Sequence, residues 1–327
     1  MFIRPTIAAV IPLYNGARFI EEAIGSVLAQ TFPPNEIIVV DDGSQDEGPE
    51  IVARYKQIKL VRKANGGQSS ARNFGVRHAT SDLIAFLDQD DIWYPAHLEY
   101  LVKPFQKSHP RPLGWVYSNL DEMDAQGRTV HRSLLHFLGA QHPKRSLGEC
   151  LARDMYILPS ASLISRAAFE RVGGFDERLS GYEDDDLFLR LFCAGYDHIF
   201  IDESLSRWRI YPDSSSYTPR MAQSRMLYAE KLLAMFPPDP ARGDYYGRNL
   251  IAPRFIAQII PECVRGIRQR DREMLQIARD HLARLVPYLP RRKRLRFSLA
   301  LLVLRSATLA RLVYHTRRAV LGLRVAH

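Results

Sequence analysis

Short runs rich in apolar residues alternate with segments of helical periodicity over the first 120 residues, and this alternation constrains the fold most strongly. Such runs are typical of strands buried on both faces. We expect strands at 7–11, 36–40, 58–61 and 83–87, with helices between them at 17–29, 46–55 and 69–79. Strands that alternate with helices form βαβ units with right-handed crossovers. The expected class is α/β, with a mostly parallel central sheet and flanking helices.

The pattern changes in the second half of the chain. Strands are expected at 113–118 and 162–165, and the segment 183–193 opens with acidic residues and continues as a helix. From about residue 218 the sequence predicts helices. Proline lacks the amide hydrogen that a helix interior needs. We therefore expect these helices to be broken at Pro237, Pro238, Pro261, Pro287 and Pro290.

Charge is distributed unevenly along the chain. The net charge is +9, but residues 281–327 hold eleven Lys and Arg and no Asp or Glu, which leaves −2 for residues 1–280. A near-neutral body argues against a general nucleic-acid-binding surface and indicates a basic C-terminal appendage. The three cysteines are too few and too scattered for a disulfide framework or a zinc site, which favours a reducing cytosol.

The basic appendage predicts contact with a membrane surface. Residues 291–296 hold five cations, and four arginines follow among apolar residues at 305–318, a pattern typical of an amphipathic segment in a bilayer interface. The apolar run at 299–304 is far shorter than the ~20 residues of a membrane span, and no secretion signal is visible. A helix packed on the rest of the chain and an oligomer contact are the alternatives. We expect a cytoplasmic protein, peripheral at the inner face of the cell membrane.

Candidate ligand-binding residues follow three of the expected strands. Pro12 and Tyr14 follow the first, Asp42 the second, and Asp88 and Asp90 the fourth. Because parallel strands end at one edge of a sheet, these residues should gather there. Gathered carboxylates repel each other unless a cation lies among them, and hard oxygen ligands suit Mg²⁺ or Mn²⁺ with substrate phosphates. The pattern favours a metal–diphosphate site, although the Asp-Asp-Gly-Ser around Asp42 is by itself ordinary turn chemistry.

A glycine-rich turn at 65–73 precedes the third expected helix. Backbone N–H groups at a helix N-terminus attract anions, and Arg72 adds a fixed positive charge. The turn is neither the dinucleotide fingerprint nor a Walker loop, since it lacks their spacing of glycine and lysine. For this segment alone, an ordinary helix entry with a solvated Arg72 is an equally good interpretation.

Together these segments resemble the inverting GT-A glycosyltransferases of family 2, of the bacterial cell-surface polysaccharide type. The resemblance covers roughly residues 5–217 and rests on motifs in the family's order, at 10–15, 26–31, 40–44, 65–75, 86–91 (the family's DxD motif), 173–177 and 183–187. It implies a Rossmann-like GT-A catalytic domain over 1–217. Its nucleotide-binding half would be about 1–110 and its acceptor-binding half 111–217, followed by a helical C-terminal region over 218–327.

The resemblance also implies roles on the donor side. Pro12 and Tyr14 would line the nucleoside pocket, and Asp42 would hydrogen-bond the base. Arg72 would lie near the base or the diphosphate, and Asp88 would approach the ribose and a metal ion. The implied donor is a nucleotide-diphosphate sugar, foremost a UDP-sugar.

Further roles implied by the resemblance concern the metal and the acceptor. Asp90, with Asp88, would coordinate Mn²⁺ or Mg²⁺ at the diphosphate, Asp184 would be the general base, and Glu183 would be its neighbour in the acceptor site. Inverting transfer is a single in-line displacement in which a carboxylate removes the acceptor proton and the metal neutralises the leaving diphosphate. Base and metal must then flank the sugar, so they should come from distant segments, as Asp90 and Asp184 do.

Three positions leave alternatives open. The acidic run at 183–186 also suits a helix N-terminus through the helix dipole, and this is the preferred account of Asp185. The family commonly carries a histidine where this chain has Tyr211, a poor ligand for a hard cation, so Arg209 could neutralise phosphate instead. Trp93 would either stack under a sugar in the acceptor site or fill the core.

The sequence thus predicts a metal-dependent inverting glycosyltransferase that uses a glycan or lipid-linked acceptor in cell-envelope polysaccharide biosynthesis. One alternative is a catalytically silent, membrane-associated scaffold that binds nucleotide-sugars, against which the intact Asp88, Asp90 and Asp184 argue. Another is a sugar-nucleotide pyrophosphorylase, which would want a glycine-rich signature with Arg or Lys near the N-terminus. Residues 12–18 do not offer one. We expect no nucleic-acid partner.

Overall fold

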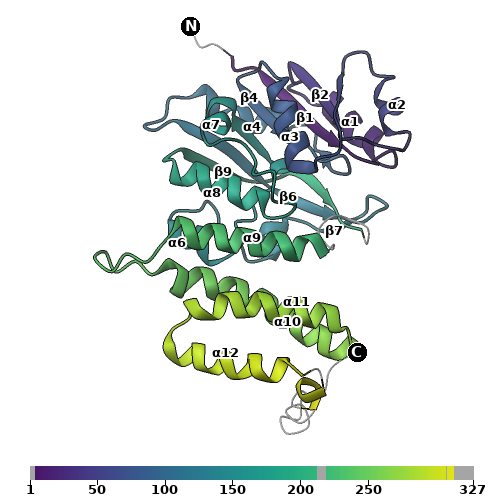
Figure 1. Cartoon of the computed structure of the whole chain (residues 1–327). Coiled ribbons are helices and arrows are strands. Elements are labelled where there is room, and N and C mark those ends of the chain that lie inside the picture. The colour runs from purple at the N-terminus through teal and green to yellow at the C-terminus, as the bar shows by residue number, and fades with distance from the viewer. Residues whose placement is uncertain (1–3, 212–218, 307, 313–327) are drawn as a thin grey trace. The chain divides into compact units, whose positions relative to one another are not determined.

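The computed structural model describes residues 4–211, 219–306 and 308–312 (Figure 1). The chain forms two compact units. The first holds residues 1–150 and 154–224, and the second holds 151–153 and 225–327. The first unit carries the β-sheet, and the second is helical.

The expected parallel strands and the helices between them are all present in the first unit. The strands β1 (Ile7–Leu13), β2 (Glu36–Asp41), β3 (Lys59–Arg62) and β4 (Leu83–Phe86) lie parallel in the order β3-β2-β1-β4. They are connected by α1 (Ile20–Leu28), α2 (Gly48–Val52) and α3 (Gln68–Arg77). Every residue of β1 is buried, which explains its continuous apolar run. Because Asp46 accepts hydrogen bonds from the N–H groups of Ala17 and Gly48, α2 begins later than predicted.

The sheet continues beyond β4 and becomes mixed. β8 (Ser162–Ser165) is antiparallel to β4, β6 (Leu113–Met123) is antiparallel to β8, and β9 (Asp197–Arg209) is parallel to β6. The short β5 (Ile92–Trp93) pairs with β9, and β7 (Thr129–His131) pairs with β6. The remaining elements are α4 (His97–Val102), η1 (Pro104–Gln106), α5 (Leu134–Phe137), α6 (Leu147–Ala152), η2 (Pro159–Ala161), α7 (Arg166–Arg171) and α8 (Glu183–Cys193). The segment 183–193 is helical as predicted, whereas β9 was not predicted.

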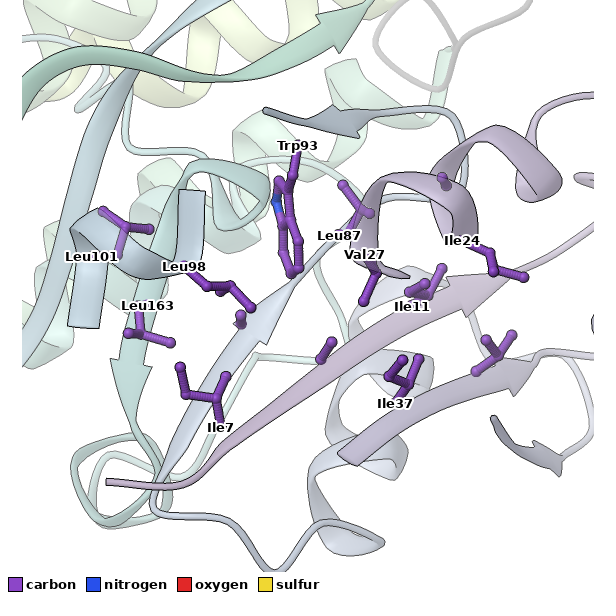
Figure 2. Close-up of a cluster of buried hydrophobic side chains, with 14 of the residues drawn as sticks. Ile7, Ile11, Ile24, Val27, Ile37, Leu87, Trp93, Leu98, Leu101 and Leu163 are labelled. Carbon is purple, nitrogen blue, oxygen red and sulfur yellow. The ribbon is translucent and has the colours of Figure 1, made fainter. Parts of the chain in front are cut away.

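An apolar core lies on β1 and its neighbours, with Ile7, Ile11 and Val27 among its buried side chains (Figure 2). Trp93 belongs to this core. Its side chain is 2% exposed, and its indole Nε1 donates a hydrogen bond to the carbonyl oxygen of Ser160 at 2.8 Å. Trp93 therefore fills the core, and its alternative assignment to the acceptor site is wrong because the ring faces cannot be reached by a sugar.

The helices of the C-terminal region are α9 (Pro219–Met235), η4 (Gly247–Ile251), α10 (Ala252–Gln269), α11 (Arg272–Leu285), η5 (Val286–Tyr288) and α12 (Arg291–Leu304). In the second unit α10 packs against α11, and α11 packs against α12. Within the ranges that the structure describes, none of the helices combines the length and the hydropathy needed to cross a bilayer.

Pro261 does not break a helix, contrary to the prediction, because α10 runs through it. Because proline has no N–H, the carbonyl of Ala257, four residues before Pro261, has no hydrogen-bond partner within the helix. Ala257 and Pro261 are both exposed, so water can satisfy that carbonyl. Ile259 and Cys263 are buried on the packed side of the helix. Packing of this face therefore outweighs the local preference of proline.

Candidate active site

A cavity of about 770 Å³ lies in the first unit, beyond the carboxyl ends of β1, β2 and β4. All of the residues that the sequence assigned to the site line this cavity, with the exception of Trp93. They are Pro12, Tyr14, Asp42, Arg72, Asp88, Asp90, Glu183 and Asp184. The topology thus brings three strand ends together with the N-terminal parts of α3 and α8.

Tyr14 lies at the edge of the cavity with 47% of its surface exposed. Its backbone is held by the side chain of Gln89, whose Oε1 accepts from the Tyr14 N–H at 2.8 Å and whose Nε2 donates to the Tyr14 carbonyl at 3.2 Å. The strand end after β1 is thereby tied to the strand end after β4. The Tyr14 ring can cover a planar group in the cavity.

Asp42 organises the glycine turn before α3. Its Oδ2 accepts a hydrogen bond from the N–H of Gly67 at 2.7 Å, both of its oxygens accept from the N–H of Gly66, and Lys63 Nζ lies 2.6 Å from Oδ1. Gly67 has φ +87°, a conformation that residues with a Cβ rarely adopt. Asp42 is only 2% exposed, so it shapes the cavity wall mainly through this turn.

Arg72 is buried and connects the two halves of the first unit. Its side chain is 1% exposed, and it donates to Asp88 Oδ1 at 2.6 Å and to Glu183 Oε1 at 3.1 Å. Burial disfavours its charge, but Asp88 and Glu183 outweigh burial and raise the pKa of Arg72. The interpretation of Arg72 as a solvated residue at a helix entry is therefore wrong.

The carboxylates after β4 differ in their surroundings. Asp88 and Asp90 face the cavity, and burial together with the charge of Asp88 raises the pKa of Asp90 to about 6. Asp91 is 2% exposed and accepts the backbone N–H of Arg209 at 3.0 Å. Burial and the charges of Asp90 and Asp88 raise the pKa of Asp91 well above its usual value. Asp91 is thus part of the framework, while Asp88 and Asp90 are available to a ligand.

These two carboxylates fit a divalent cation of the kind that takes most of its ligands from a substrate. Among residues 4–211, 219–306 and 308–312, no group of three or more His, Cys, Asp and Glu side chains is arranged to enclose a metal ion. Mg²⁺ is commonly held by one or two carboxylates, with water and substrate phosphates completing its shell. Asp88 and Asp90 supply one or two such carboxylates at the cavity wall.

Tyr211 and Arg209 make hydrogen bonds to the segment after β4. The Tyr211 hydroxyl donates to Asp90 Oδ2 at 2.8 Å. Arg209 is 3% exposed, and its guanidinium donates to the Asp90 carbonyl at 2.7 Å and to Glu22 Oε2 at 2.5 Å. Arg209 also lines the cavity, so its role as a phosphate ligand in place of the family's histidine stays a prediction.

The four acids at the start of α8 differ in their surroundings. Glu183, Asp184 and Asp185 line the cavity, and burial, Glu183 and Asp185 raise the pKa of Asp184 well above its usual value. Asp185 is 4% exposed and accepts the Met155 N–H at 2.8 Å. Asp186 is fully buried and pairs with Arg190 on the next turn of the helix. Asp185 and Asp186 therefore fix the start of α8 through specific contacts. For Asp185 we had expected only a favourable interaction of its charge with the helix dipole.

The cavity also has an apolar side that the sequence did not indicate. It is lined by Leu134, Leu135, Leu138, Tyr156, Leu158, Trp208 and Met221. Tyr156 is 36% exposed and has φ +54°, which is costly for a residue with a Cβ. These residues come from α5, β9, α9 and the irregular segment before η2, which lie far apart in the sequence, so only the folded structure brings them together.

Comparisons with known proteins agree with the fold and identify the family. A family model described as glycosyl transferase family 2 matches residues 8–173. An uncharacterized glycosyltransferase of Rickettsia typhi is 32% identical over 222 residues, which cover 65% of this chain and 67% of that protein.

Two solved structures have a similar fold. S. aureus TarS in complex with UDP-GlcNAc has a TM-score of 0.68 at 18% identity, over 98% of this chain and 93% of that chain. The mannosyltransferase PcManGT from Pyrobaculum calidifontis, in complex with GDP-Man and Mn²⁺, has a TM-score of 0.56 at 18% identity, over 98% of this chain and 81% of that chain. At such identities the likeness shows the fold alone. With the family match, we conclude that this chain is a glycosyltransferase of GT-A fold that belongs to glycosyl transferase family 2.

Proposed function

We propose that this chain transfers a sugar from a nucleotide-diphosphate sugar to an acceptor hydroxyl in one inverting displacement. The observation that carries the proposal is that one cavity is lined by Asp88 and Asp90 after β4 and by Asp184 on α8. Asp90 and Asp184 are 94 positions apart in the sequence. In-line displacement needs a base on one side of the reacting sugar and a site for the leaving diphosphate on the opposite side. Residues from segments far apart in the sequence can provide the two.

In this proposal residues 1–217 form the catalytic part, and its first half binds the donor. Pro12 and the exposed ring of Tyr14 would border the nucleoside. Asp42 would shape the base pocket, both directly and through the N–H groups of Gly66 and Gly67 that it holds. TarS and PcManGT were solved with UDP-GlcNAc and GDP-Man, and a UDP-sugar is our leading donor.

Asp88 and Asp90 would hold Mn²⁺ or Mg²⁺ together with phosphate oxygens of the donor. When bound, such an ion supplies positive charge that neutralises the leaving diphosphate. Tyr211 would orient the Asp90 carboxylate through its hydrogen bond to Oδ2. Support comes from the position of both carboxylates in the wall of the cavity and from the Mn²⁺ in the PcManGT complex.

Asp184 would act as the general base. As the acceptor oxygen attacks the anomeric carbon, its proton passes to the Asp184 carboxylate. The bond from that carbon to the diphosphate oxygen breaks on the opposite side, so the configuration inverts. Burial and the neighbouring acids raise the pKa of Asp184, which makes its ionised form a stronger base. Arg72 would limit the repulsion between Glu183 and Asp184 because it pairs with Glu183.

The acceptor would be a glycan or a lipid-linked saccharide used in cell-envelope polysaccharide biosynthesis. Tyr156 and Trp208 on the apolar side of the cavity offer ring faces on which the C–H face of a sugar can stack. The excess of cations in residues 281–327 supports a peripheral position at the inner face of the cell membrane, where a lipid-linked acceptor can be reached.

The test is nucleoside-diphosphate release by the purified full chain, measured with a panel of nucleotide-sugars, glycan and lipid-linked acceptors, and Mn²⁺. We expect release that excess chelator abolishes, a product whose anomeric configuration is opposite to that of the donor, and loss of release in Asp90→Ala. The control Asp280→Ala removes an exposed carboxylate from the second unit and should behave as wild type. Retention of configuration would overturn the inverting step, and full turnover in chelator would overturn the metal role. Donor binding without release with every acceptor would instead indicate a silent scaffold.

A further inference from the structure

α12 presents exposed leucines on one face. Leu295, Leu299 and Leu302 are 65%, 57% and 54% exposed, and steps of four and three residues place them in one stripe along the helix. By the same geometry, Phe297 and Leu301 lie on the opposite side, and both are less exposed. α12 packs against α11, and its Phe297 and Leu301 are partly buried, whereas no described residue of the second unit covers the leucine stripe.

Exposed arginines border this stripe on both sides. With about 3.6 residues per helical turn, Arg292 and Arg296 fall on one flank, and Arg294 and Arg305 fall on the other. No acidic residue occurs anywhere in 281–327, so no carboxylate of this segment compensates the charge. We call Leu295, Leu299, Leu302 and these four arginines the α12 stripe.

We infer that the α12 stripe docks on the surface of an anionic lipid bilayer, with its leucines at the acyl-chain boundary and its arginines among the headgroups. Exposed leucines can enter the acyl-chain boundary, and the neighbouring arginines are attracted by anionic headgroups. Charge favours a bilayer over a second copy of the chain as the partner of the α12 stripe. Pairing two α12 stripes would bring eight arginines together without a carboxylate from either segment. The inference rests on the proposed position at the membrane and is independent of the transfer reaction.

Binding of the full chain to sedimenting vesicles tests the inference. Vesicles of phosphatidylcholine with phosphatidylglycerol should bind the protein at low salt, and pure phosphatidylcholine vesicles should bind it far less. Each buried leucine contributes about tenfold, so Leu299→Ser with Leu302→Ser should weaken binding about a hundredfold. Removing three cations with Arg292→Gln, Arg294→Gln and Arg296→Gln should also weaken it about a hundredfold and reduce its dependence on salt.

Matched controls separate the stripe from general hydrophobicity and charge. Leu227→Ser changes a leucine that is 48% exposed on α9 and should leave vesicle binding unchanged. Arg54→Gln with Lys56→Gln and Lys107→Gln removes the same number of exposed cations from the first unit and should change binding less than threefold.

Three results would overturn the inference. The first is wild-type protein that does not bind the anionic vesicles, and the second is stripe variants that bind them as strongly as wild type. The third is a wild-type protein that forms a dimer and binds no vesicles, with the dimer dissociated by the leucine substitutions. Thermal stabilisation by UDP-GlcNAc with Mn²⁺ and diphosphate release are measured on the same preparations. Failure of vesicle binding with these readouts intact overturns the docking alone, whereas their failure with vesicle binding intact overturns the proposed transfer reaction alone.

Discussion

Replacing Arg72 with methionine should destabilise the first unit strongly. The methionine keeps much of the volume but leaves Asp88 and Glu183 without the cation that lies 2.6 Å and 3.1 Å from them. Removing one partner of a buried ion pair costs about 3–5 kcal/mol. Because the side chains of Asp88 and Glu183 are still 23% and 11% exposed, water relieves part of this cost, and we expect about 3 kcal/mol.

Urea denaturation of the metal-free protein measures this effect. With a slope of about 2–3 kcal/mol per molar, the loss lowers the midpoint by about 1–1.5 M. The control Arg178→Met removes a guanidinium that pairs with Asp176 but is 76% exposed, and should change stability by less than about 0.5 kcal/mol. Equal midpoints for Arg72→Met and wild type would refute the idea that Arg72 is the cation that neutralises both carboxylates.

The same substitution should change the pH dependence of turnover. Burial, Glu183 and Asp185 raise the pKa of Asp184, and Arg72 opposes them. Without Arg72 the pKa of Asp184 rises further, so the base becomes ionised only at higher pH. The acid limb of the pH–rate profile should therefore move upward in Arg72→Met, and a limb that stays in place or moves to lower pH would contradict this coupling.

Three further substitutions test single contacts. The pKa of Asp90 is raised from 3.8 to about 6, so ionising this carboxyl costs stability as pH rises through that interval. Asp90→Asn should therefore stabilise the metal-free protein by about 3 kcal/mol at pH 7 and by much less at pH 4. Urea titrations at the two pH values measure this difference. Tyr211→Phe removes the hydrogen bond to Asp90 and should raise the Mn²⁺ concentration for half-maximal donor binding about tenfold; an unchanged value would show that the contact is not used. Asp185→Ala leaves the buried N–H of Met155 without its acceptor and should lower the free energy of unfolding by about 1–3 kcal/mol, which a urea midpoint equal to wild type would exclude.

Local pattern was sufficient for the parts of the fold whose burial is uniform. β1 is buried along its whole length, so its apolar run marks it clearly. β9 is partly exposed, and polar residues interrupt its apolar ones, so its pairing with β6 and β5 is not visible in its own sequence. At Pro261 the local preference was clear but tertiary packing of α10 outweighed it.

The candidate site was predictable where residues follow strands or open a helix. Asp42, Asp88 and Asp90 line the cavity because parallel strands end at one edge. The apolar side of the cavity was not predictable, because Tyr156 lies in an irregular segment and Trp208 lies on β9, a strand that its own sequence does not reveal. The bridge that Arg72 makes was equally hidden, since it depends on the distance between α3 and α8 in the folded chain.

Kinetics of Asp184→Asn test the central claim most directly, because asparagine keeps the shape of the side chain and removes its basicity. Positioned proton transfer contributes about 10²–10⁴-fold. Turnover should fall on that scale, while donor affinity, measured by titration with a UDP-sugar and Mn²⁺, stays within about twofold of wild type. Asp185→Asn retains an oxygen that can accept the Met155 N–H and should keep most of the activity. Wild-type turnover in Asp184→Asn, or an equal loss of donor affinity, would contradict the assignment of Asp184 as the general base.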